Sequence, residues 1–192
     1  MSKRIVSCAD GTWLDPLNNT NVYRLYKALE VSAEQVTFYD DGVGADTTGI
    51  AHILDGAFGA GLLQKIQDGY TTIAHTYEPN DQLFLFGFSR GAYTVRCLAG
   101  MIAACGLPTG TFTNDCITQA FAAYRNPSQR AAILAGLAAY NLQPAAIQMV
   151  GVWDTVGALG VPAIFGGVDQ KKYGFLDTAL HPCIKNAFHC IA

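Results

Sequence analysis

The stretch QLFLFGFSRGAYTVRCLAG, residues 82–100, decides the fold class. It opens with an apolar run rich in aromatic residues, which is typical of a buried β-strand, and continues with apolar residues at helical spacing. A serine flanked by glycines, Gly87-Phe88-Ser89-Arg90-Gly91, stands where the two patterns meet. The sequence therefore predicts a strand that turns sharply into a helix at Ser89.

The same two patterns alternate along the chain. Apolar runs that predict strands occur again at residues 4–10, 35–41 and 147–154. Helical spacing occurs at residues 21–30, where Asn21 is a candidate N-cap, at 62–77, at 90–105 with a C-cap at Gly106, and at 128–141 with a possible cap at Ser128. Strands that alternate with helices predict an α/β fold, with a mainly parallel sheet flanked by helices. A length of 192 residues suits one domain over residues 1–192.

Residues 42–61 contain six glycines and interrupt this alternation. A connection of that length and composition predicts a flexible loop, and long loops in compact domains are often functional. A lid over a pocket is the corresponding hypothesis.

Composition excludes several classes of function. The net charge of −3 and the pI of about 5.7 give no basic field for nucleic acid. No signal peptide and no run of about 20 apolar residues is visible, so we expect no transmembrane segment and synthesis in the cytoplasm. The six cysteines are scattered without CxxC or Cys/His clusters, which argues against metal and against a disulfide scaffold. Cys8, Cys97 and Cys105 lie in apolar runs, which favours buried free thiols. We expect no cofactor, and no GxGxxG or P-loop spacing supports a nucleotide site.

Ser89 is the candidate nucleophile. The G-x-S-x-G spacing is typical of a serine held in a strained turn, because Gly87 and Gly91 lack side chains that would collide with neighbouring elements. The N–H of Arg90 then lies at a helix start, where the dipole favours the negative charge of an oxyanion. A serine that merely caps the helix is the simpler alternative.

A seryl nucleophile needs an acid and a base, which follow it in the order Ser, acid, His in this fold class. Asp154, at the end of the fourth strand run, is the candidate acid, although it could also cap a turn. The motif DGTW follows the first strand, and Gly11 or Thr12 is expected to supply a second oxyanion amide unless the motif is a plain turn.

The candidate base is not predicted to lie in the local structure that a catalytic histidine of this fold class needs. His181 and His189 are the histidines that follow Asp154, and His189 is the candidate. The pattern IKNAFHCIA around His189 predicts a helix rather than a loop after a strand, and no fifth strand is expected. A histidine on an apolar helix face is more often packed than catalytic.

The motifs CADGTW, NTNVYRLYKAL, YDDGVGA, FLFGFSRGAYTVRCLAG and VGVWDTVGALG resemble an α/β-hydrolase-domain family that includes type VI secretion phospholipase effectors of the Tle1-like kind. The resemblance runs in order along nearly all of the chain. It implies Ser89 as nucleophile, Asp154 as triad acid, and hydrolysis of carboxylic (phospho)lipid esters. It also implies a catalytic histidine in a later Gly-x-His-Ser-Asp-Val-Gly-Gly type motif, which this sequence lacks, and a last strand beyond residue 192.

Two functions stay open at this point. One is a serine esterase or phospholipase, for which this chain is the N-terminal portion of the catalytic domain. The other is a truncated, inactive relative that binds lipid or a protein partner. Expected partners are a lipid or small ester, a membrane surface, a second copy of the chain, or an immunity protein. Export without a cleaved signal peptide would suit the effector branch.

Overall fold

A computed structural model describes residues 2–11, 14–42, 55–156 and 173–191. Its elements, in chain order, are β1 (Arg4–Ala9), a 3-10 turn η1 (Pro16–Asn18), α1 (Asn21–Ala28), β2 (Gln35–Asp40), α2 (Asp55–Thr76), β3 (Gln82–Phe88), α3 (Arg90–Cys105), α4 (Asn114–Arg125), α5 (Arg130–Gly136), η3 (Ala138–Tyr140), β4 (Ile147–Trp153) and β5 (Ala187–Cys190).

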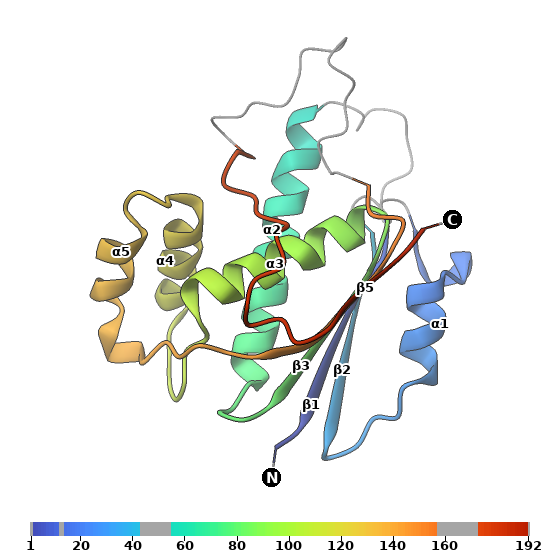
Figure 1. The fold of residues 1–192 in the computed structure, drawn as a ribbon, viewed down its shortest axis with the longest axis horizontal. Coiled ribbons are helices and arrows are strands. Elements are labelled where there is room, and N and C mark those ends of the chain that lie inside the picture. The colour runs from blue at the N-terminus through green and yellow to red at the C-terminus, as the bar shows by residue number, and fades with distance from the viewer. Residues whose placement is uncertain (1, 12–13, 43–54, 157–172, 192) are drawn as a thin grey trace.

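The strands form one sheet in the order β2-β1-β3-β4-β5, and every neighbouring pair is parallel. Helix α1 covers one face of the sheet, whereas α2 and α3 cover the other and α4 and α5 pack outside them (Figure 1). The predicted α/β class with a mainly parallel sheet is confirmed. Strands β1 and β3 are neighbours in the sheet, but the chain continues from β1 to β2 on one side and from β3 to β4 on the other. In parallel sheets, ligands bind in a crevice at the carboxyl ends of the two strands at such a switch point.

Hydrophobic residues fill both faces of this sheet. The larger core lies between the sheet and α2, α3 and α4, and contains fully buried side chains such as Ile66, Leu83 and Met101. The smaller core lies beneath α1 and is built around Val6, Cys8 and Val22. Because the central strands are covered on both faces, their sequences are nearly continuous apolar runs rather than alternating ones.

The four predicted strands and the helix over 90–105 form as expected, and Gly106 ends α3 with φ of 74° while its N–H donates to the Ile102 carbonyl. The predicted cap of α1 is one residue off. Thr20, not Asn21, is the N-cap, because its hydroxyl accepts the N–H of Tyr23.

Two other predictions of local structure are wrong. The sequence predicts a loop over residues 42–61, but helix α2 already begins at Asp55. Residues 43–54, which include most of the proposed lid, lie outside the described residues. The helix expected over 128–141 ends at Gly136, starts after Gln129 rather than at Ser128, and gives way to η3. Glycine is a poor helix former, which suits an end at Gly136.

A further correction concerns the end of the chain. Residues 187–190 form strand β5 on β4, not a helix, and the sheet therefore does have a fifth strand. The apolar spacing of this segment fits a helix, but the open edge of β4 offers backbone partners that local spacing does not reveal. All four residues of β5 are exposed.

Candidate active site

Ser89 lies between the end of β3 and the first turn of α3, beside the switch point between β1 and β3. Its φ of 55° and ψ of −118° are a conformation that residues with side chains rarely adopt. Main-chain hydrogen bonds hold it there: the Ser89 N–H donates to the Trp153 carbonyl at 2.9 Å, and the Ser89 carbonyl accepts the Val156 N–H at 3.2 Å. The side chain is half-buried and makes no capping hydrogen bond to α3, so the serine is not used as an ordinary helix cap.

The two glycines of the motif are required by close packing. A Cβ on Gly87 would lie 2.6 Å from the Cα of Ala92, and one on Gly91 would overlap the carbonyl oxygens of Ala9 and Asp10. Real Cβ atoms do not approach main-chain atoms so closely. The glycines therefore let β1, β3 and α3 converge at Ser89.

The predicted oxyanion donors differ in what the structure shows of their N–H groups. The N–H of Arg90 lies in the first turn of α3, where the helix dipole favours negative charge. Gly11 is beside the nucleophile, since a Cβ built on it would lie 3.1 Å from the Ser89 Cβ, but its N–H donates to Asp10 Oδ1 at 3.0 Å. In this structure the Gly11 amide is therefore engaged by Asp10, and its role as an oxyanion donor stays a prediction. Thr12 lies outside the described residues.

Asp154 occupies the end of β4, the strand next to β3. Like Ser89 it has a positive φ, of 44°, and its N–H donates to the Cys190 carbonyl of β5 at 2.9 Å. Trp153, directly before it, and Val156, two residues after it, form the two main-chain hydrogen bonds to Ser89. The structure thus joins the backbones that carry the predicted nucleophile and the predicted acid.

His189 lies on β5, in register with Val152 of β4, and its side chain is exposed. Its Nε2 accepts the Thr155 N–H at 3.2 Å, so the lone pair at that nitrogen is engaged. Within the described residues no hydrogen bond joins His189 to the Ser89 hydroxyl. Ser89 and Asp154 nevertheless directly follow β3 and β4, and His189 lies near the end of β5, so the three residues are at the carboxyl ends of adjacent strands.

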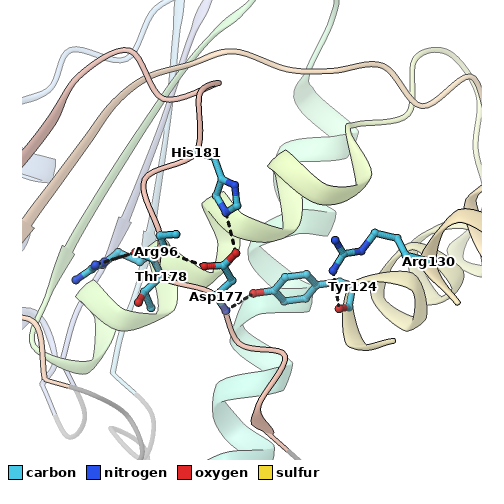
Figure 2. Close-up of polar contacts among 7 residues, drawn as sticks. Arg96, Tyr124, Arg130, Asp177, Thr178 and His181 are labelled. Atoms are coloured by element: carbon cyan, nitrogen blue, oxygen red, sulfur yellow. Dashed lines mark hydrogen bonds and ion pairs between the residues drawn. The ribbon is translucent and has the colours of Figure 1, made fainter. Parts of the chain in front are cut away.

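His181 belongs to a different cluster. Its Nε2 lies 3.0 Å from Asp177 Oδ2, and the Asp177 N–H donates to the Tyr124 hydroxyl (Figure 2). Arg96, two turns into α3, donates to the Thr178 carbonyl and fixes the same segment. This cluster joins residues 177–181 to the later turns of α3 and to α4, and not to the turn at Ser89.

A buried carboxylate beside the site escaped sequence reasoning. Asp10, at the end of β1, is 3% exposed and accepts hydrogen bonds from the Thr20 and Tyr39 hydroxyls as well as from the Gly11 N–H. The available signal was an aspartate at a strand's carboxyl end. Nothing in the local sequence indicates that Tyr39, on β2, is its partner.

Other chemistry is sparse in the described part of the chain. No group of three or more His, Cys, Asp or Glu side chains there could hold a metal ion, and no helix in those ranges is long and apolar enough to cross a bilayer. Cys8, Cys97 and Cys105 are buried free thiols as predicted, and burial raises the pKa of each to about 12.

The chain matches a described protein family along almost all of its length. Residues 3–192 match the family described as "T6SS, Phospholipase effector Tle1-like, catalytic domain". The chain belongs to this family.

Two individual similarities accompany the family match. An uncharacterized protein of Saccharomyces cerevisiae, YEL023C, is 35% identical over 122 residues, which cover 55% of this chain and 18% of that protein. The chain therefore spans less than a fifth of this curated relative. The solved structure of an acetylxylan esterase covers 100% of this chain and 83% of its own, with 15% identity and a TM-score of 0.42.

Proposed function

We propose that this chain carries the nucleophile and acid of a serine hydrolase that cleaves carboxylic esters of lipids, phospholipids included. The observation that supports this most strongly is the conformation of Ser89. A strained serine, bonded through its own backbone to both sides of the Asp154 turn, is a costly arrangement unless the hydroxyl has a task.

The chemistry assigned to these residues is acyl transfer. The Ser89 Oγ attacks the ester carbonyl while its proton passes to the base, and the carbonyl oxygen becomes an oxyanion near the Arg90 N–H. The oxyanion collapses, the C–O bond to the alcohol breaks, and the alcohol leaves with the proton from the base. Water then attacks the acyl-serine by the same route and releases the fatty acid.

His189 is the candidate base among the residues of this chain, whereas the family resemblance places the catalytic histidine in a later Gly-rich motif. The later histidine is the base that we propose, with His189 as the alternative. Asp154 and His189 follow Ser89 in the order that hydrolases of this class use, and they lie at the carboxyl ends of successive strands. To take the Ser89 proton at Nε2, His189 must first release the Thr155 N–H. If His189 is the base, the β5 end must therefore rearrange when substrate binds.

The family description supports the proposed substrate and setting. The description names a phospholipase effector of a secretion system, which supports a phospholipid ester as substrate and secretion as the setting. Our proposal adds a membrane surface as the place of action, an immunity protein as partner and export without a cleaved signal peptide. No cofactor takes part in the proposed reaction.

A fluorophosphonate probe tests the proposal, because it forms a bond only with an activated serine. Wild-type protein should be labelled at Ser89, as located by peptide mass spectrometry, and should hydrolyse short p-nitrophenyl esters. Ser89→Ala should abolish both, Asp154→Asn should slow labelling by about 10²–10⁴-fold, and Ser32→Ala, an exposed serine before β2, should change nothing.

Two further outcomes bear on the base and on the reaction. Full reactivity of His189→Gln would show that the base comes from elsewhere in the protein. Absence of labelling and hydrolysis in the wild type would contradict the hydrolase, and a saturable rise in Tm with a lipid ligand would then favour a binding protein.

A further inference from the structure

We propose that Asp10 is a positioning residue of this active site: its buried carboxylate, held by the hydroxyls of Thr20 and Tyr39, fixes Gly11 against Ser89. The inference rests on the proposed function of Ser89 as nucleophile. It concerns a residue that touches neither substrate nor the reacting atoms.

Both oxygens of the Asp10 carboxylate accept hydrogen bonds. Its Oδ1 accepts the Gly11 N–H at 3.0 Å, and its Oδ2 accepts the Thr20 hydroxyl at 2.6 Å and the Tyr39 hydroxyl at 2.8 Å. A buried carboxylate is costly unless hydrogen bonds compensate for the lost water. Here the donors come from three different places in the fold, so the side chain fixes their relative positions.

These hydroxyls tie the carboxylate to neighbouring elements. The Thr20 hydroxyl accepts the Tyr23 N–H at 3.0 Å while it donates to Asp10, which links the start of α1 to the end of β1. Tyr39 is on β2, and burial together with the hydrogen bond to Asp10 raises its pKa. The phenol therefore stays protonated and remains a donor at neutral pH.

The network ends against the nucleophile. The Gly11 N–H is held by Asp10, and the Gly11 carbonyl accepts the Leu14 N–H at 3.0 Å, so this residue is fixed at both ends. A Cβ on Gly11 would lie 3.1 Å from the Ser89 Cβ, and a Cβ on Gly91 would overlap the Asp10 carbonyl oxygen. A shift of Asp10 would consequently move the wall beside Ser89 and the first turn of α3.

The role is geometric rather than electrostatic. A negative charge buried near Ser89 would by itself oppose formation of an oxyanion, so a benefit has to come from position. Misplacement by about 1 Å at a reacting centre can reduce a rate by about 10²-fold. Asn in place of Asp10 keeps the size of the side chain, but its NH₂ cannot accept the two hydroxyl hydrogen bonds.

The test uses the full-length protein and compares kcat, KM, the rate of fluorophosphonate labelling and Tm. We expect Asp10→Asn to lower kcat and the labelling rate by about 10- to 100-fold with KM changed less than about 3-fold. Tyr39→Phe and Thr20→Val should each lower kcat by a smaller factor. Thr20→Ser keeps a hydroxyl and should restore nearly wild-type kcat.

Asp81→Asn is the matched control, because Asp81 is also a buried carboxylate with several donors but stands at the opposite, amino-terminal edge of the sheet. It should lower Tm and leave kcat unchanged. If Asp10→Asn fails to fold, kcat of Tyr39→Phe and of Thr20→Val is compared with kcat of Thr20→Ser instead.

The inference is overturned if folded Asp10→Asn, or both hydroxyl variants, keep kcat within twofold of wild type while Ser89→Ala abolishes it. It is also overturned if Asp81→Asn lowers kcat as much as Asp10→Asn. If wild type and Ser89→Ala are equally unreactive, the proposed function itself is wrong, and the inference fails with it.

Discussion

Replacement of Ser89 by glycine should make the protein more stable while it removes the nucleophile. The φ of 55° and ψ of −118° at Ser89 cost about 1–3 kcal/mol for a residue with a Cβ. Glycine relieves that strain but adds about 0.5–1 kcal/mol of conformational entropy to the unfolded chain. The net gain should be about 1 kcal/mol, which for a chain of this size raises Tm by about 2–4 °C.

Ser89→Ala is the decisive comparison, since it removes the hydroxyl but keeps the Cβ and hence the strain. We expect its free energy of unfolding to stay within about 0.5 kcal/mol of wild type. Asn80→Gly tests the same substitution at an exposed turn where φ is 80°. Asparagine tolerates that conformation, so the gain there should be only a few tenths of a kcal/mol, roughly.

Urea denaturation at pH 7, with Tm from calorimetry, measures these differences. A Ser89→Gly variant no more stable than Ser89→Ala would refute the view that the backbone at the nucleophile is strained.

Three further predictions concern the scaffold. Asp81→Asn should cost about 2 kcal/mol at pH 7; burial alone would raise the pKa of Asp81, but hydrogen bonds from Lys3 and from the Glu78 N–H lower it. Because a lowered pKa in the folded state gives stability that is lost as pH falls through that pKa, the difference from wild type should shrink in denaturation curves below about pH 4. Gly91→Ala should destabilise by about 3 kcal/mol and abolish ester hydrolysis, since its Cβ would overlap main-chain oxygens; an active variant of wild-type Tm would contradict the packing. In native protein, a disulfide reagent at pH 8 should react first with exposed Cys190, and rapid reaction of the buried thiols Cys8, Cys97, Cys105 and Cys116 would argue against the described core.

The sequence predicts the central part of the fold well because the information there is local. Strand β3 and helix α3 are encoded by contiguous apolar runs, and the glycines at 87 and 91 mark the turn between them. Parallel pairing follows from the alternation of strands and helices. The same local signals indicated Ser89 and Asp154 as residues at strand ends.

The parts that the sequence does not predict depend on distant partners. The sequence around His189 has the apolar spacing of a helix, but the segment forms strand β5 because the edge of β4 offers backbone hydrogen-bond partners. Asp10 owes its environment to Thr20 and Tyr39, which are 10 and 29 residues away in the chain. The Gly11 N–H cannot be known to point at Asp10 until the backbone is placed.

The most direct test of the central claim is a crystal structure of the phosphonate adduct. The account predicts phosphorus bonded to Ser89 Oγ, with a phosphoryl oxygen about 2.7–3.1 Å from the Arg90 N–H. A probe bonded to another residue, or a phosphoryl oxygen turned away from the first turn of α3, would contradict it.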